Sequence, residues 1–398
     1  MTTHLLTNAR IVTPTENFIG SVEIQDGIIA AVEKGKTYVS GIDVKGQWLI
    51  PGCIDIHTDY LERELYPRPS AAFPLPFAMH FLDVRAACCG ITTVFSAISF
   101  SDNQAKNRSF DEAMELAQQV DAARNSMLVR HYLHARIDPN TNTIFKYLDA
   151  MTKLESLYMV IYNDQIPGQR QFTVEQHIEM WSKGLKITAE EAAQMLVQQA
   201  EKLSTINNRG AIEETFKNKC ILGSHDDTTI EHVVEGKAFG ATLSEMPTTM
   251  EAARKAKELG LWVCLGAPNY YRGGSHCGNL SSIDALNEDL VDIFCSDYHF
   301  PTMLGSVVKM IENGIEPSRA VNMMSLNPAR LLKFDKEIGS IEVGKKADLV
   351  VFDSKNSLAA VSLVLVDGII KYRAEYEAQI NPLATELSEE SQLRELYK

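Results

Sequence analysis

The sequence lacks several features that mark whole classes of proteins. It has no run of about 20 apolar residues that could span a membrane, and Met1 to Gly20 show no charged segment followed by an apolar one. An excess of basic residues is also missing, since 38 Lys and Arg stand against 52 Asp and Glu, a formal net charge of −14. We therefore expect an unexported cytoplasmic protein that binds neither nucleic acid nor a membrane.

Cysteines are few and show no metal-binding spacing. The chain has seven, among them the adjacent pair Cys88 and Cys89, and none form a CxxC or CxxxxC pair. This pattern argues against a disulfide framework or a zinc-cysteine site. We expect these side chains to act as small buried hydrophobic groups.

The chain is long enough for one large domain and a small one. Its 398 residues, 45% hydrophobic and 23% charged, have an ordinary globular composition. Strand-like alternation and turns fill both ends, whereas buried-type strands alternate with helical segments in between. We predict an α/β fold, a TIM-like (β/α) barrel over 53–334 with a small β-sandwich from 1–52 and 335–373. The tail, 374–398, is acidic and polar and is either a docked helix or frayed.

Polar side chains with metal-binding chemistry recur where the predicted barrel strands end. His57 and Asp59 stand two apart after one apolar run, so on a strand they point the same way. Barrel enzymes place their sites at the carboxyl ends of their strands. Imidazole and carboxylate groups there suit one or two divalent ions, which would lower the pKa of bound water. The candidate ligands are His57, Asp59, Asp164, His225, Glu245 and Asp297.

Asp297 has a second possible role. A carboxylate beside metal-activated water can accept its proton, so Asp297 is also our candidate for the catalytic general base.

Two motifs resemble the amidohydrolase superfamily: Pro51-Gly52-x-Ile54-Asp55-x-His57, and Gly339-Ser340-Ile341-x-x-Gly344-Lys345-x-Ala347-Asp348-Leu349-Val350. The resemblance implies a metal-bearing barrel beside a small β-sandwich built from both chain ends. It also implies a divalent metal, with zinc expected and manganese, iron or magnesium as alternatives. Asp59 and Glu245 stand where histidine is usual, and no bridging lysine is evident on the fourth strand, which leaves the number of ions open at one or two.

Four further segments resemble a phosphonate-degrading branch of the superfamily that hydrolyses a sugar triphosphate. They are His57-Thr58-Asp59 with Pro67-Arg68-Pro69, Pro167 to Phe172, Ser224 to Thr228, and Gly266 to His276. The likeness implies cleavage of a phosphoanhydride in a ribose methylphosphonate triphosphate, with release of diphosphate. The expected partner is then a phosphorylated sugar, and we expect a homo-oligomer.

An acidic protein with such a substrate needs positive charge concentrated at its site. Arg63, Arg68, Arg170 and Arg272 fall on predicted loops after barrel strands, and the amides of Gly273 and Gly274 could hold phosphate oxygens. The full expected set of substrate-binding residues is Arg63, Arg68, His134, Arg170, Asn269, Arg272 and His276.

Two other functions remain open from the sequence. The same scaffold supports hydrolysis of C–N bonds, as in cyclic amidases and nucleobase deaminases, although a neutral ring would not need several arginines. A non-catalytic protein on this scaffold is the third possibility, and the convergence of His57, Asp59, His225 and Asp297 argues against it.

Overall fold

The computed structural model describes residues 3–68, 71–102, 108–164, 166–170, 172–275, 277–355 and 357–376. Contacts divide these residues into two compact units. One holds the N-terminal part up to Asp55, residues 83–93 and the chain from His299 onward; the other holds Ile56–Leu82 and Val94–Tyr298. The domain limits expected from the sequence stay a prediction.

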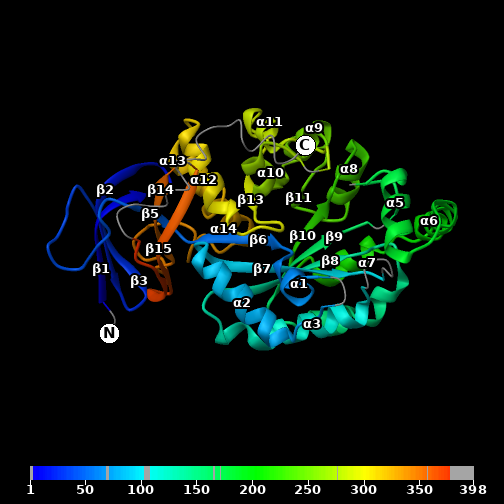
Figure 1. Cartoon of the computed structure of the whole chain (residues 1–398), viewed down its shortest axis with the longest axis horizontal. Coiled ribbons are helices and arrows are strands. Elements are labelled where there is room, and N and C mark those ends of the chain that lie inside the picture. Colours follow the sequence, from blue (N-terminus) through cyan, green and yellow to red (C-terminus); the bar gives the residue numbers. More distant parts are fainter. Residues whose placement is uncertain are drawn as a thin grey trace. The chain divides into compact units, whose positions relative to one another are not determined.

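One of the two eight-stranded sheets is the predicted barrel. Its strands run in the order β6 to β13, and every neighbouring pair from β8 to β13 is parallel. They are β6 (Cys53–Thr58), β7 (Ile91–Phe100), β8 (Arg130–Ile137), β9 (Leu157–Tyr162), β10 (Ile221–His225), β11 (Leu243–Glu245), β12 (Trp262–Gly266) and β13 (Ile293–Cys295). Every residue of β7 is buried, as in parallel strands covered on both faces. The predicted α/β barrel is confirmed (Figure 1).

The two edge strands of this sheet meet at their carboxyl ends. A parallel bridge joins Thr58 to Asp297. The amide of Asp297 donates to the carbonyl of His57 over 3.0 Å, and the amide of Asp59 donates to the carbonyl of Asp297 over 2.7 Å. These bonds bring the first and last strands together where the candidate ligands lie.

One barrel strand was harder to predict than the others. β8 carries Arg130, His131, His134 and Arg136, which interrupt the apolar run that identifies a buried strand. His131, His134 and Arg136 are buried all the same, with His134 fully enclosed, whereas Arg130 is partly exposed. The strand is therefore held by its neighbours in the barrel rather than by its own hydrophobicity.

Helices connect the barrel strands, and their starts follow local capping rules. α3 (Phe110–Ala123) begins where Ser109 accepts a hydrogen bond from the Glu112 amide. α6 (Ala189–Ser204) begins with a capping box between Thr188 and Glu191. The remaining helices before β13 are α1 (Tyr60–Leu65), α2 (Leu75–Cys88), α4 (Leu148–Thr152), α5 (Val174–Leu185), α7 (Arg209–Phe216), α8 (Ile230–Ala238), α9 (Met250–Glu258), α10 (Ala267–Arg272) and α11 (Ser282–Asn287).

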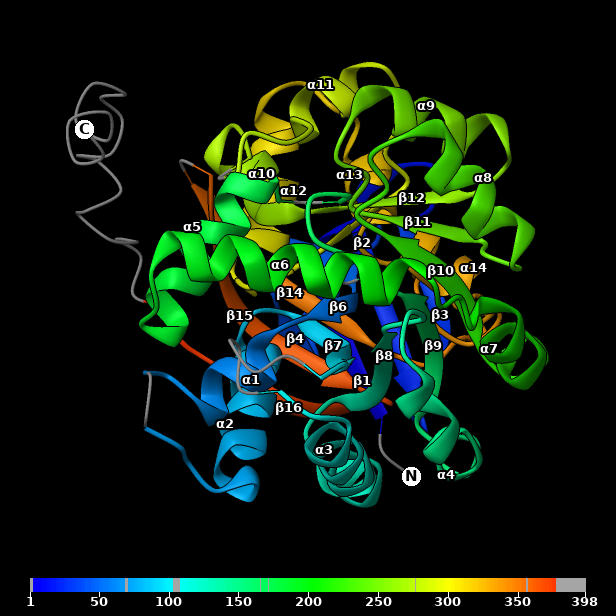
Figure 2. The same ribbon diagram turned by 90° about the vertical axis from the view of Figure 1, so that its right-hand side faces the viewer.

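Helices α5 and α6 lie on the side of the barrel at which the strands end. Figure 2 looks at that side and shows both helices in front of the barrel strands. No residue of α5 is buried. Among the described residues, no helix combines the length and the apolar character needed to cross a membrane.

The second sheet joins the two ends of the chain. Its order is β16-β15-β14-β5-β1-β2-β3, with β4 beside β1. The strands are β1 (Thr3–Val12), β2 (Asn17–Gln25), β3 (Ile28–Lys34), β4 (Ile42–Asp43), β5 (Trp48–Pro51), β14 (Leu349–Lys355), β15 (Leu358–Val366) and β16 (Ile369–Arg373). The join is the antiparallel pairing of β5 with β14, in which Ile50 faces Val350.

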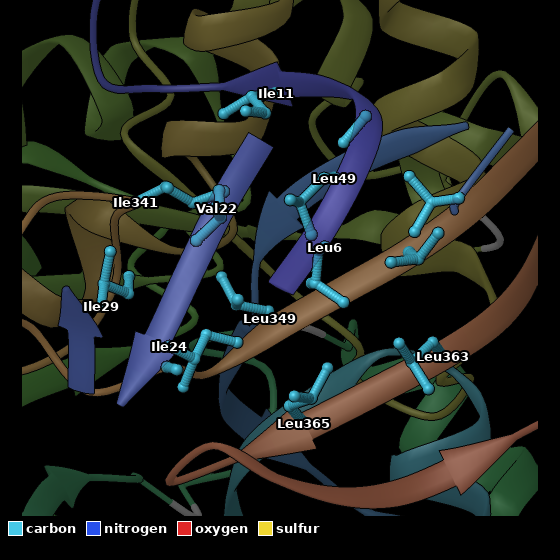
Figure 3. Packing of buried hydrophobic residues seen from close by; sticks show 14 residues of the cluster. Leu6, Ile11, Val22, Ile24, Ile29, Leu49, Ile341, Leu349, Leu363 and Leu365 are labelled. Atoms are coloured by element: carbon cyan, nitrogen blue, oxygen red, sulfur yellow. The ribbon is translucent and has the colours of Figure 1, made fainter. Parts of the chain in front are cut away.

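The core of this sheet draws on both ends. Leu6, Val22 and Ile24 from the first strands share one buried cluster with Leu349 and Leu365, and Figure 3 shows these side chains together. Burial of large aliphatic groups from both ends stabilises the pairing of segments that lie far apart in the sequence.

The strands near the C-terminus fill less of the chain than the sequence suggested. The β-rich segment was expected over 335–373, but its first strand, β14, begins at Leu349, and turns and loop occupy 338–348. Gly339 and Gly344 there have φ of 90° and 92°, which a strand does not allow. Three helices precede this loop, α12 (Thr302–Glu312), α13 (Pro317–Asn322) and α14 (Leu326–Leu332). Of the predicted tail, 377–398 lies outside the described residues, and 374–376 form no helix or strand.

The cysteines are free in the structure. Cys53, Cys220, Cys264 and Cys295 are buried, as expected, while Cys88, Cys89 and Cys277 are partly exposed.

Candidate metal centre

Three histidines surround one carboxylate oxygen at the carboxyl ends of the barrel strands. Oε2 of Glu245 lies 3.0 Å from Nδ1 of His57, 2.9 Å from Nδ1 of His225 and 3.6 Å from Nε2 of His134. All four side chains are at least nine-tenths buried. The rings of His57 and His225 stack with their centroids 5.6 Å apart. Strands β6, β8, β10 and β11 thus each bring one side chain to the same point.

Two groups of side chains here have the geometry to hold a metal ion. One is His57, His134 and Glu245; the other is His57, Asp59 and Asp297, and the ligand atoms within each group lie within 4.8 Å of one another. In the first group Nε2 of His134 and Oε1 of Glu245 are buried and make no hydrogen bond to any described residue. Imidazole nitrogen with carboxylate oxygen is a donor set that divalent zinc, iron or manganese accepts. The first group therefore fits a divalent metal.

The protonation states of His134 and Glu245 also suit metal ligands, whereas for His57 burial lowers the pKa but the carboxylates of Glu245 and Asp59 outweigh it and raise that pKa well above its ordinary value. Nδ1 of His134 lies 2.8 Å from the carbonyl oxygen of Ile56, to which it donates, so Nε2 keeps its lone pair. Burial lowers the pKa of His134 to about 4, which keeps the ring neutral. Burial alone would raise the pKa of Glu245, but the rings of His57 and His134 outweigh it and hold that pKa well below its ordinary value. A neutral imidazole and an ionised carboxylate are the forms that bind metal.

A buried arginine stands beside the second group. Nη2 of Arg136, the residue two positions after His134 on β8, lies 2.9 Å from Oδ1 of Asp59. The Arg136 side chain is 8% exposed. Its Nε and Nη2 make no hydrogen bond to the part of the chain that the structure describes. Arg136 is the main residue of the site that our predicted set of ligands and substrate-binding residues left out.

Burial also affects Asp297. It raises the pKa of this carboxyl group to about 6, and the nearby carboxylate of Asp59 acts in the same direction against the opposing effect of His57. The predicted ligand or base thus has a proton affinity suited to exchange near neutral pH.

The backbone bends sharply at three of the strand ends. Asp226, Met246 and Asp297 have φ of 55°, 54° and 55°, in the left-handed region that non-glycine residues rarely adopt. Each still donates its amide to the next strand, to the carbonyls of Glu245, Cys264 and His57 respectively, over 2.8 to 3.0 Å. Strained backbone of this kind gathers at functional sites, where the surrounding structure holds it in place.

Two of the expected site residues belong to a buried ion network instead. Arg170 pairs with Asp164 and, over 2.7 Å, with Asp227, and Arg209 bonds both oxygens of Asp164. Asp227 also accepts hydrogen bonds from Ser224 and from Ser244, the latter over 2.7 Å. Asp164, expected as a metal ligand, is in neither metal-binding group found among the described residues. No pattern in the sequence indicated that Arg209 belongs to this network.

The other expected arginines are exposed. Arg63 donates to the carbonyl of Tyr298, and its guanidinium carbon lies 5.2 Å from the ring centre of Tyr60. Arg68 and Arg272 are also exposed. The prediction that these residues lie on loops was wrong for Arg63, which is in α1, and for Arg272, which ends α10.

The loop after α10 does not offer the amides that we expected for phosphate. Those of Gly273 and Gly274 bond the carbonyls of Tyr270 and Asn269 over 3.2 and 2.9 Å, because they close the end of the helix. The Asn269 side chain donates to the Leu280 carbonyl over 2.8 Å and accepts from the Ser282 amide over 3.1 Å, so it anchors the following loop. His276 lies outside the described residues.

Comparisons with known proteins agree with this fold. Residues 185–372 match the model of the Amidohydrolase family. The chain is 31% identical over 365 residues to alpha-D-ribose 1-methylphosphonate 5-triphosphate diphosphatase of Escherichia coli, covering 89% of this chain and 96% of that enzyme. It is 28% identical to an adenine deaminase of Clostridium botulinum, over 42% of this chain and 29% of the deaminase. The crystal structure of a D-hydantoinase matches with a TM-score of 0.62 at 15% identity, covering 93% of this chain and 95% of that one.

A parallel barrel with histidines and carboxylates at its strand ends defines a metal-dependent hydrolase. The chain belongs to the amidohydrolase family, as the sequence motifs predicted.

Proposed function

We propose that this hydrolase cleaves a phosphoanhydride bond of α-D-ribose 1-methylphosphonate 5-triphosphate and releases diphosphate. Similarity to the Escherichia coli diphosphatase along nearly the whole of both chains supports this substrate. Adenine deaminases match this chain less well, at 28% identity over 42% of it or at 23% identity over 85% of it.

The observation that carries the proposal is the buried guanidinium of Arg136. It lies at the end of β8, two residues from His134. Its Nε and Nη2 make no hydrogen bond to a described residue, although Nη2 lies 2.9 Å from Oδ1 of Asp59 in an ion pair. A buried cation with unused N–H donors is suited to an anionic group, and phosphoryl oxygens are acceptors of this kind. A neutral ring or amide would leave these donors unsatisfied, which costs free energy.

In the proposed reaction, each residue of the site has a separate role. His57, His134 and Glu245 would hold a divalent metal, with His225 beside them. When bound, such an ion lowers the pKa of water and polarises a phosphoryl oxygen. Asp297 accepts the proton of the attacking water, since its pKa is raised by burial to about 6. Arg136 stabilises the negative charge that grows on the non-bridging oxygens in the transition state.

The test is the identity of the product. Purified protein is incubated with zinc and the ribose methylphosphonate triphosphate, and phosphorus NMR separates diphosphate from phosphate. Diphosphate as the first product, lost in the Asp297→Asn variant, supports the proposal. If the wild type and Asp297→Asn both give single phosphate and no diphosphate, the phosphate comes from a contaminating phosphatase. The protein then does not release diphosphate, and the proposed function is overturned.

The rival is C–N hydrolysis, and the same preparation decides it. Release of ammonia from adenine, or opening of a hydantoin ring, with no phosphorus product from the triphosphate, would replace the phosphoanhydride reaction by the chemistry of the deaminase or hydantoinase relatives. No reaction with any of these substrates would favour a non-catalytic protein.

The identity of the metal, the partners and the cellular location are part of the same proposal. We propose zinc as the metal, a phosphorylated sugar as the only class of partner besides further copies of the chain, and the cytoplasm as the location. Elemental analysis, mass measurement in solution and cell fractionation test them separately.

A further inference from the structure

The two metal-binding groups share one side chain. Both include His57, whose Nδ1 lies 3.0 Å from Oε2 of Glu245 and whose Nε2 lies 3.7 Å from Oδ1 of Asp59. A neutral imidazole has a lone pair on only one of its two nitrogens. Filling both groups through the two nitrogens would require the ring to lose its second proton as well. This geometry favours one ion over two.

A positive charge already stands at the second group. The guanidinium of Arg136 lies 2.9 Å from Asp59, and Arg136 is 8% exposed, so water screens its charge little. An ion bound to the same oxygen of Asp59 would lie within a few ångströms of that guanidinium. Repulsion between two cations at this distance in a buried site is strong. Arg136 therefore offsets the charge of Asp59 without a metal.

We propose that the site holds one divalent ion, bound through His57, His134 and Glu245, and that Arg136 takes the place of a second ion beside Asp59 and Asp297. Arg136 supplies the fixed charge that a second metal would supply, and it also brings N–H donors. This inference concerns ion binding alone, so it holds or fails independently of the substrate.

Elemental analysis gives the first test. The full-length protein is saturated with zinc, separated from unbound ions and analysed for zinc per chain. The wild type is expected to hold one ion, and two tightly bound ions per chain would overturn the proposal.

Variants of Arg136 give the second test. Arg136→Met keeps a long side chain but removes the charge, so the expected zinc content rises from one to two per chain at saturation. Arg136→Lys keeps the positive charge, so this variant is expected to bind one zinc ion per chain. Arg272→Met, at an exposed position, is the matched control and also stays at one. A content of one in folded Arg136→Met overturns the claim that Arg136 excludes the second ion.

Asp59→Asn keeps the proposal testable if Arg136→Met does not fold. Because Asp59 pairs with Arg136 and does not bind the single ion, the zinc dissociation constant of Asp59→Asn is expected to stay within about threefold of the wild-type value. A loss of zinc by this variant would make Asp59 a ligand and overturn the assignment.

Cobalt gives an independent spectroscopic readout of the same variants. One cobalt(II) per chain gives an uncoupled electron paramagnetic resonance signal, whereas two ions in neighbouring groups couple and reduce it. The wild type is expected to give the uncoupled signal, and Arg136→Met the reduced one at saturation. A reduced signal in the wild type overturns the proposal.

Discussion

Arg170 donates a hydrogen bond from Nη1 to Oδ1 of Asp227 over 2.7 Å, in an ion pair whose side chains are 8% and 0% exposed. The same guanidinium bonds Asp164, and Nη1 also lies 3.2 Å from the carbonyl oxygen of His225. Arg170 thus ties the segment after β9 to the end of β10, next to a histidine of the metal centre. The positive charge of Arg170 is therefore offset by carboxylates inside the protein.

Replacement of Arg170 is therefore expected to destabilise the fold. Arg170→Ala leaves Asp164 and Asp227 buried with one partner fewer, and breaking a buried pair in this way costs about 3–5 kcal/mol. Arg272→Ala, at an exposed position, is expected to change the free energy of unfolding by no more than about 0.5 kcal/mol. Urea unfolding of the two variants measures the difference, and equal stabilities would mean that the network around Arg170 contributes little.

Glu245 is expected to control metal content. Glu245→Gln keeps the size of the side chain but removes the charge that faces His57, His134 and His225. Loss of even an indirect partner costs about 10–100-fold in metal affinity, and loss of a direct ligand is expected to cost at least that much. Titration with zinc against a competing chelator gives the affinity, and an unchanged value would remove Glu245 from the ligand set. Glu288→Gln, in an exposed pair with Arg254, is the control.

Asp297 is expected to matter for turnover. Asp297→Asn removes the group that accepts a proton, so kcat is expected to fall by about 10²–10⁴-fold. Zinc content measured on the same sample separates the two roles predicted from the sequence. Unchanged zinc with lost turnover indicates a base, and loss of both indicates a ligand; full turnover in the variant would exclude either role.

Asp138 predicts a pH dependence of stability. Burial raises the pKa of this carboxyl group, which follows β8, from its ordinary value near 4 to about 7, against the opposing hydrogen bond from the Asn140 amide. Above pH 4 the unfolded chain loses this proton while the folded chain keeps it. Asp138 therefore costs stability increasingly up to about pH 7, after which the cost stays constant.

Asp138→Asn keeps an oxygen for the Asn140 amide and removes this cost. The variant is expected to be more stable than the wild type at pH 8, by up to about 4 kcal/mol for about three pKa units, and by clearly less at pH 5. Urea unfolding at both pH values measures the gain, with Asp149→Asn as an exposed control. A gain of the same size at both pH values would show that the charge of Asp138 is not its source.

Gly339 and Gly344, both in the motif that runs from Gly339 to Val350, have different surroundings. Both have left-handed φ, but a Cβ on Gly339 would lie 2.6 Å from Cβ of Ala329 and 3.0 Å from the carbonyl oxygen of Ser325, whereas one on Gly344 would meet nothing within 4 Å. Gly344→Ala is expected to cost about 1–2 kcal/mol for the backbone conformation alone. Gly339→Ala is expected to cost about 1–3 kcal/mol more, because atoms must also move apart. Thermal unfolding of the two variants measures their losses of stability. Equal losses would show that the residues around Gly339 move apart at no cost in free energy.

Local pattern was enough to find the strand ends of the barrel. His57, His225, Glu245 and Asp297 each follow a short apolar run, and the structure brings all four to the same end of the sheet. β8 shows the limit of this pattern. The side chains that make it functional, His134 and Arg136, also remove the hydrophobic run that would have identified it.

The sequence by itself determined the α/β barrel, the sheet built from both chain ends and the residue types at the strand ends, because the alternation of apolar and polar residues is a local property. Only the tertiary structure decided what each charged side chain faces. Arg170 and Arg272 look alike in the sequence, yet one is enclosed by Asp164 and Asp227 and the other is exposed. Arg136 faces Asp59, 77 positions away in the printed sequence, across the barrel end. Such partners are set by how the strands are ordered around the barrel, and the spacing of residues along the chain does not carry that order.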